Sequence, residues 1–333
     1  MSLSSAQSAV RGVFALQVVV AVLAFLLTLV ITYLAISLFT HRASRHRSNR
    51  TSPKGTLAFL LLGILCLAIA QAATAASVAL QTDASSPISI THAFSLHYDT
   101  TNPNSSPSTT STNLSFLNAV AFILSTVALN GAVWLHSSHA TSNGLAIGQP
   151  SWLSIALNTL LLTAMLGTGF ASFGLAASSY TPASRYGTVL QADRAARITY
   201  TVFRACVVGA STSVSTEAIR RFKQVKNNSS RDAAERPILT RLALLAVPLI
   251  LLRSAFIVVD IALLWVADTY PTWSAGAQEA VAFLLIIFGP YAELWVFAIV
   301  GWGAWGMSKL GSRGREGEYG LVTGEGSEGG GGS

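Results

Sequence analysis

The stretch AVPLILLRSAFIVVDIALLWVA (Ala246–Ala267) decides the fold class, because it is apolar from end to end except for Arg253 and Asp260. It is long enough to cross a bilayer, for which a helix needs about 20 apolar residues. A charge near the centre of a spanning helix costs roughly 2.5–3.5 kcal/mol. Two charges of opposite sign in one such helix therefore predict partners elsewhere in the membrane.

The composition of the whole chain agrees with a membrane protein. The 333 residues are 51% hydrophobic and only 11% charged, whereas soluble domains carry about 25% charged residues. The basic residues lie in short segments between apolar runs, and this distribution excludes a nucleic-acid partner. Cys66 and Cys206 each lie inside an apolar run, which is typical of buried thiols rather than of an extracellular disulfide framework.

Seven apolar segments have the length of a membrane span. We therefore predict an all-α, polytopic fold with a seven-helix transmembrane domain over 1–306 and a disordered cytosolic tail over 307–333. The fifth span is the most polar, because "STSVSTE" forms its second half. The first is too long for a cleaved signal peptide and is expected to act as the targeting signal. The expected spans are 13–39, 56–80, 116–136, 152–178, 198–219, 242–265 and 277–302.

Lysine and arginine in the connecting segments predict the orientation. They are frequent in 40–55, in 220–241 and at the start of the tail, and absent from the predicted outer loop 81–115. Because cytosolic loops carry the excess of basic residues, the N-terminus is expected outside and the C-terminus in the cytosol. The outer loop also holds sequons at Asn104 and Asn113, which predict a glycoprotein of the plasma membrane or an endomembrane, delivered by the secretory pathway.

The outer loop contains one further pattern, and the histidines bear on chemistry. Residues 88–98 alternate between apolar and polar types, which predicts a short extracellular strand. His92 and His97 would point to opposite faces of that strand, so they do not predict a metal site. The other histidines lie in loops or at span ends, and no lysine lies inside a span. These absences argue against retinal, haem and catalytic zinc, so we expect a non-enzyme without a metal or cofactor.

Four charges lie inside the expected spans and away from their ends: Arg204, Arg253, Asp260 and Glu293. Arg253 and Asp260 are about 10 Å apart along their helix, too far for a direct pair. Sign and depth instead predict the pairs Arg204–Asp260 and Arg253–Glu293, both between consecutive spans, which are often adjacent. These charges either hold the bundle together or line a polar pathway for a ligand.

Other residues suggest breaks and contacts in the same helices. Pro248 and Pro290 cannot donate a backbone hydrogen bond, so each is expected to kink its helix. Small residues at Thr163, Gly167 and Ala171 recur every four positions and predict close packing against a neighbouring helix.

The last third of the chain carries a resemblance. "ERPILTRLALLAVPLILLRSAFIVVDIALL" (235–264), followed by "AVAFLLIIFGPYAELWVFAIVG" (280–301), resembles fungal seven-span integral membrane proteins of unknown function. An arginine followed by an acid is also similar to the lipid-translocating exporter family linked to resistance to toxic sterols and amphiphiles. That family usually has glutamate where Asp260 stands, and its second basic residue has no counterpart, since Phe256 and Ile257 occupy that place.

The resemblance implies a fungal plasma-membrane or endomembrane protein that handles or senses lipids or amphiphiles. We therefore expect a protein that moves or protects against lipids or small amphiphiles, with membrane lipids as partners and a polar cavity between spans five to seven. The alternative is a divergent seven-span receptor, in which the basic loop 220–241 and the tail bind a cytosolic partner. The third span ends in "AVWLHSSH" and the last contains "FGPYAELWVF". Neither sequence matches the motifs of the large G-protein-coupled receptor family.

Overall fold

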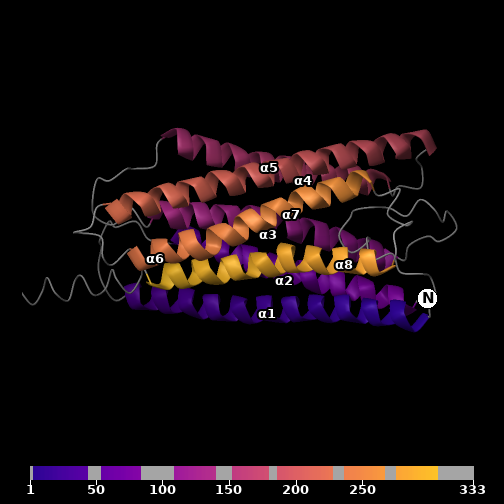
Figure 1. Ribbon diagram of the computed structural model, residues 1–333, viewed down its shortest axis with the longest axis horizontal. Helices are drawn as coiled ribbons and strands as arrows, with labels where there is room; N and C mark the ends of the chain where they lie inside the picture. The colour runs from indigo at the N-terminus through magenta and orange to yellow at the C-terminus, as the bar shows by residue number, and fades with distance from the viewer. Residues whose placement is uncertain are drawn as a thin grey trace, which may run out of the picture.

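The computed structural model describes residues 3–43, 54–83, 109–139, 152–179, 186–227, 236–266 and 275–306, and these residues fold into a bundle of long helices. Consecutive helices run in opposite directions, roughly parallel to the long axis of the bundle (Figure 1). The predicted outer strand over 88–98, the sequon at Asn104 and the tail 307–333 lie outside the described residues.

Five helices are unbroken, and two are built from several pieces. The unbroken ones are α1 (Leu3–Ala43), α2 (Lys54–Asp83), α3 (Thr109–His139), α4 (Trp152–Ser179) and α5 (Tyr186–Asn227). The sixth helix consists of α6 (Arg236–Arg241), the π-turn η2 (Leu242–Ala246) and α7 (Val247–Trp265). The seventh consists of α8 (Ala275–Ile286), the π-turn η4 (Ile287–Tyr291) and a further α-helix over 292–306.

Among the described residues, six helices are long and apolar enough to cross a membrane: Phe14–Ser37, Gly55–Ser77, Asn113–Ser138, Trp152–Ala177, Arg236–Trp265 and Ala280–Gly306. The architecture is therefore that of an all-helical, multi-pass membrane protein, as the composition predicts. The segment expected as the fifth span, 198–219, lies within α5, which is long but too polar to be counted with the other six.

Several helices extend beyond the boundaries expected from hydropathy. α2 continues to Asp83 and α3 begins at Thr109, so both ends of the predicted outer loop 81–115 are helical. The predicted basic loop 220–241 is likewise wrong at both ends, because α5 runs to Asn227 and α6 begins at Arg236. Hydropathy marks only the apolar part of a helix, whereas a helix can continue beyond it through long polar side chains, as in RRFKQVK (220–226) at the end of α5.

Each of the two predicted proline kinks coincides with a π-turn. Pro248 is the second residue of α7, which follows η2 directly. The N–H of Val247 donates to the carbonyl of Leu242, five residues back. Pro290 lies inside η4, and the N–H of Ala292 reaches the carbonyl of Ile287. Because proline cannot donate and its ring clashes with the carbonyl four residues back, the wider turn accommodates the ring without ending the helix.

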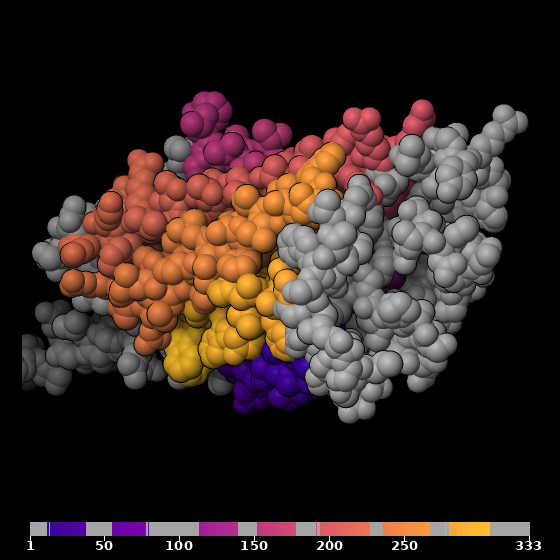
Figure 2. All heavy atoms as spheres, turned by 45° about the vertical axis from the view of Figure 1, so that its right-hand side comes forward, coloured from indigo at the N-terminus to yellow at the C-terminus, as the bar shows by residue number. Residues whose placement is uncertain are grey.

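The hydrophobic core consists of two large clusters of buried side chains. One joins α1, α2, α3, α5, the sixth helix and 292–306, and includes Leu60, Leu129, Leu242 and Phe297. The other joins α3, α4, α5 and α7 around Met165 and Phe203. On the face shown in Figure 2, the sixth helix lies between α5 and the last helix. The centre of the bundle is therefore shared by α3, α5, α7 and 292–306.

The predicted packing of the small residues on α4 is wrong. Thr163, Gly167 and Ala171 all lie on the exposed face of α4, and an added Cβ at Gly167 would meet nothing within 4 Å. One close approach of helices occurs at Gly63 on α2. A Cβ there would lie 2.5 Å from Cζ of Phe297 and 3.0 Å from Cβ of Ala128.

We predict that Gly63→Ala destabilises the bundle. Phe297 is fully buried, so its ring has no room to move away from a new methyl group. Overpacking of this kind costs roughly 1–3 kcal/mol and outweighs the gain in helix propensity of up to about 1 kcal/mol. Thermal unfolding of the purified protein in detergent measures the effect. The matched control Gly167→Ala gains the propensity without the clash, so an equal loss of stability in both variants would contradict this packing.

Candidate functional site

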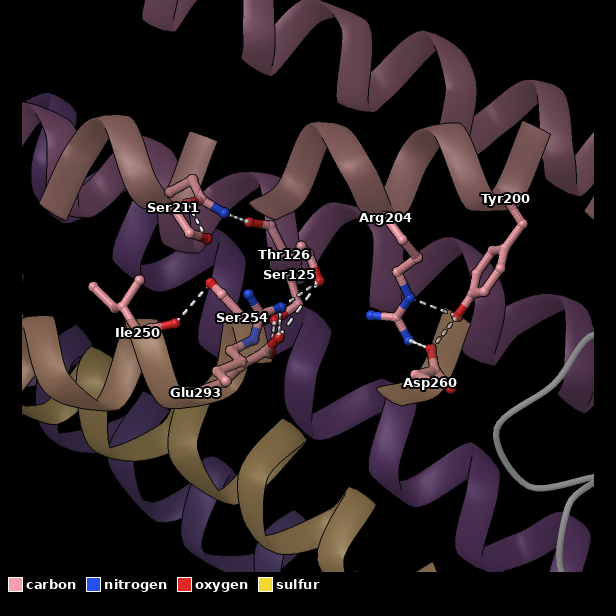
Figure 3. Close-up of polar contacts among 11 residues, drawn as sticks. Ser125, Thr126, Tyr200, Arg204, Ser211, Ile250, Ser254, Asp260 and Glu293 are labelled. Atoms are coloured by element: carbon pink, nitrogen blue, oxygen red, sulfur yellow. Dashed lines mark hydrogen bonds and ion pairs between the residues drawn. The ribbon is translucent and has the colours of Figure 1, made fainter. Parts of the chain in front are cut away.

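The candidate site has two halves. The less deeply buried one, called here the outer half, joins α5 to α7 through a charged pair. Nη2 of Arg204 lies 2.5 Å from Oδ2 of Asp260, and Nε of Arg204 donates to the hydroxyl oxygen of Tyr200 at 2.8 Å. The Tyr200 hydroxyl in turn donates to Asp260 at 3.3 Å. The guanidinium also lies over the rings of Phe122, at 4.8 Å, and of Tyr200, at 5.0 Å. Figure 3 shows this triad of labelled side chains beside the inner group.

The inner half is more deeply buried and centres on Arg253 and Glu293. The two side chains form an ion pair and are 2% and 1% exposed. Nη2 of Arg253 donates to Glu293 and to Oγ1 of Thr126, the latter at 3.2 Å. Ser125 and Thr126 on α3 donate to the two carboxylate oxygens of Glu293 at 3.4 and 3.5 Å. Three helices, α3, α7 and 292–306, therefore meet at one carboxylate.

Further polar contacts extend the inner group toward α5. Ser211 donates to Oδ1 of Asn130 at 3.1 Å, and the Asn130 amide donates to the backbone carbonyl of Thr126 at 3.0 Å. Ser254, next to Arg253, donates to the carbonyl of Ile250 in its own helix. The two halves together make a line of polar groups, called here the polar seam, between α3, α5, α7 and 292–306 (Figure 3).

The antiparallel register of α5 and α7 sets the spacing of the two halves. Ser211 is seven residues beyond Arg204 on α5, and Arg253 is seven residues before Asp260 on α7, so Ser211 and Arg253 lie at the same depth. Seven residues of helix correspond to about 10 Å. The layer between the halves is apolar, because Val207 and Ile257 belong to one buried cluster.

The two ion pairs are the ones predicted from sign and depth. A proline lies near the seam in the sixth and in the seventh helix, as predicted. Pro248 is five residues before Arg253, and Pro290 is three residues before Glu293. Asn113 lies apart from the seam, exposed in the first turns of α3. Asn104 lies outside the described residues. Glycosylation at both asparagines stays a prediction.

Sequence reasoning missed the contribution of α3 to the seam. Ser125 and Thr126 bond to Glu293, and the Phe122 ring covers Arg204. No sequence signal marks these residues, because serine and threonine in apolar helices usually bond to their own backbone. Tyr200 carried a weak signal, since it precedes Arg204 by four residues and so shares its helix face.

Arg221 was expected in the connecting loop 220–241, but it is a buried residue of α5. Its side chain is 2% exposed, where Nε binds Glu217 at 2.6 Å and Nη1 donates to the Ser137 carbonyl oxygen at 2.8 Å. A basic side chain bonded to carbonyls of the last turn caps a helix C-terminus, here that of α3. The i, i+4 spacing from Glu217 to Arg221 is the signal that could have found it.

The charges of the seam cancel, with two arginines against two carboxylates. Burying such groups is costly, and removing one partner of a buried pair costs roughly 3–5 kcal/mol because it leaves an uncompensated charge. Replacing both partners by apolar residues of similar volume is often neutral. Burial of the seam therefore costs folding free energy in a bundle that apolar packing could also stabilise.

Comparisons of the chain with protein-family models, curated proteins and solved structures find no match. The resemblance of residues 235–301 to lipid-translocating exporters therefore rests on the quoted motif and stays a prediction.

We predict strong coupling between the inner partners. Arg253→Met and Glu293→Met should each lower the melting temperature and the yield of monodisperse protein, because each leaves one buried charge unpaired. The double variant should recover most of both losses, since its buried group is neutral. Thermal unfolding in detergent with a double-mutant cycle measures the coupling. A double variant no better than the worse single one would show that the two side chains do not pair.

Proposed function

We propose that this chain is a seven-span integral membrane protein that binds and moves lipids or small amphiphiles along the polar seam. The observation that carries the proposal is the seam itself, which places four charges among apolar side chains in the interior of the bundle. Ionisable groups within a membrane usually serve a ligand or an ion pathway. The apolar surroundings of the seam suit a ligand with a polar headgroup and a long apolar tail.

The direction of the side chains on α5 supports a seventh span. Its polar residues Arg204, Ser211 and Ser215 are buried inside the bundle. Mean hydropathy counts these residues against membrane insertion, although their side chains do not face lipid. The exposed positions between 198 and 216 are all uncharged: Ile198, Val202, Ala205, Thr212 and Thr216.

Seven antiparallel spans put the two ends of the chain on opposite sides of the membrane. In Figure 1 the N-terminus lies at one end of the bundle, and the end of α5 and the start of α6 lie at the other. The basic stretches 40–55 and 220–241 both adjoin that second end. Since cytosolic segments carry the excess of lysine and arginine, the N-terminus is outside and the second end is cytosolic in our proposal.

The boundary between α7 and η4 offers a lateral route from lipid to the inner pair. Phe256 and Phe288 stack there with their ring centroids 4.0 Å apart, and both side chains are partly exposed. Phe256 lies one turn from Arg253, and Gly289, next to Phe288, has no side chain within 4 Å of its Cβ position. Rotation of the two rings would open a path for a headgroup, while the tail stays in the lipid.

We predict that the orientation can be read from glycosylation. Asn104→Gln and Asn113→Gln should each remove one glycan, so that the double variant migrates like enzymatically deglycosylated protein on a denaturing gel. Asn227→Gln should not change the migration, because its sequon lies at the end of α5, on the cytosolic side in our proposal. A glycan at Asn227 would show that the orientation is the opposite of the one proposed.

We predict that the purified protein moves fluorescent phospholipid between the leaflets of reconstituted vesicles. The variant Arg253→Met with Glu293→Met should retain the fold and slow this movement roughly ten-fold or more, because it lacks a charge-assisted hydrogen bond to the headgroup worth about 1.5–3 kcal/mol. Chemical quenching of the outer-leaflet label measures the rate.

Arg220→Ala is the matched control, because this arginine is exposed near the end of α5 and lies outside the seam. Its rate should equal that of the unmodified protein. Absence of protein-dependent movement for every phospholipid would contradict the proposal. A cytosolic signalling response to an added amphiphile in cells, without such movement, would favour the receptor instead.

A further inference from the structure

Arg253 has a donor that the protein does not use. Its Nη2 serves both Glu293 and Thr126, but Nη1 has no hydrogen-bond partner among the residues that the structure describes. The whole side chain is 2% exposed, so this donor is buried. A buried charged group with an unused donor is unfavourable unless a bound group accepts from it. Nη1 therefore offers a site for an oxygen acceptor from a ligand.

A second polar atom without a partner lies on the neighbouring helix. Oγ of Ser215 is buried and has no hydrogen-bond partner among the described residues. It is one turn along α5 from Ser211, which lies at the depth of Arg253. A hydroxyl can donate as well as accept. A guanidinium and a hydroxyl from two packed helices are the kind of donors that hold a phosphate or carboxylate oxygen.

Glu293 accepts three hydrogen bonds in its charged form. The donors to its carboxylate are Arg253, Ser125 and Thr126. The apolar spans of the neighbouring helices α1 and α2 contain no charged side chain. The other charged groups of the seam are Arg204 and Asp260, about 10 Å away along α7. An anion on Arg253 would thus compete with Glu293 for the same positive charge. Two negative groups sharing one arginine in a low-dielectric site favour protonation of the carboxylate.

The surroundings of Glu293 can hold the protonated form. A carboxylic acid donates one hydrogen bond, and the hydroxyls of Ser125 and Thr126 can turn from donors into acceptors. Arg253 keeps its charge throughout, because a guanidinium does not deprotonate in proteins. The inner pair therefore combines a fixed positive charge with a negative charge that one proton can remove.

We propose that the Arg253–Glu293 pair is a proton-coupled site for the anionic phosphate headgroup of a phospholipid. This inference rests on the proposed function and adds the substrate class. When the headgroup oxygen accepts from Nη1 of Arg253, Glu293 takes a proton from a hydronium ion, leaving water. The site stays electrically neutral, and one proton accompanies each anionic lipid. The headgroup arrives from the membrane past the Phe256–Phe288 stack rather than from water.

The test uses the full-length protein in vesicles that enclose a pH-sensitive dye. The probes are fluorescent phosphatidylglycerol, with a net negative charge, and fluorescent phosphatidylcholine, with the same phosphate but a compensating choline. We expect phosphatidylglycerol movement to rise as pH falls from about 8 to about 6, by at most about ten-fold per unit, because one proton is taken up with each lipid. Proton entry should accompany it. Phosphatidylcholine needs no proton and should show no such rise.

Glu293→Gln mimics the protonated acid and should move phosphatidylglycerol at a rate independent of pH, without proton entry. Glu217→Gln, which removes a carboxylate outside the seam, should keep the pH dependence. The measurements on the unmodified protein remain decisive if Glu293→Gln does not fold.

Equal pH dependence for both lipids, or movement without proton entry, would overturn the inference and leave the proposed function standing. Absence of all lipid movement would overturn both. Inhibition of phosphatidylglycerol movement by millimolar inorganic phosphate would also overturn it, because the site would then take a water-borne anion instead of a membrane headgroup.

Discussion

The burial of Arg253 against Glu293 is the constraint on which the rest of the bundle depends. Neither charge can be left alone at this depth, so α7 and the helix over 292–306 must stay in contact at this level. The carboxylate also needs Ser125 and Thr126, which fixes the rotation of α3. Apolar packing alone tolerates small rotations of helices, whereas this set of directional contacts does not.

The two π-turns fit this constraint. A π-turn inserts one residue without ending the helix, so it shifts the face that later residues present. η4 ends two residues before Glu293, and η2 lies on the other side of the contact, before Arg253. Both turns occur where proline removes a backbone donor. The same prolines that interrupt the regular hydrogen bonding therefore precede the two residues whose directions matter most.

The sequence predicted the charged pairs but not the hydroxyl groups of Ser125 and Thr126 that bind Glu293, and the difference has a physical cause. Four charges in an apolar background are unmistakable, and sign and depth leave few pairings for Arg204 and Arg253. Ser125 and Thr126 give no such signal, since hydroxyls within helices bond equally well to their own backbone, as Thr74 does here. The helix boundaries were missed because hydropathy records where lipid ends, whereas helical hydrogen bonding continues beyond that point.

The polar character of α5 and the burial of Arg221 show why direction matters more than composition. A hydropathy window counts Arg204 and Ser211 against membrane insertion, although both side chains are buried inside the bundle. Arg221, which was expected in the connecting loop 220–241, is likewise buried, because the end of α5 packs against α3 and the carbonyl groups there accept its donors. In a bundle with a polar interior, the helix with the poorest apolar composition is the one that lines the interior. The polar residues of α5 that lower its hydropathy, such as Arg204 and Ser211, are therefore the residues that form the seam.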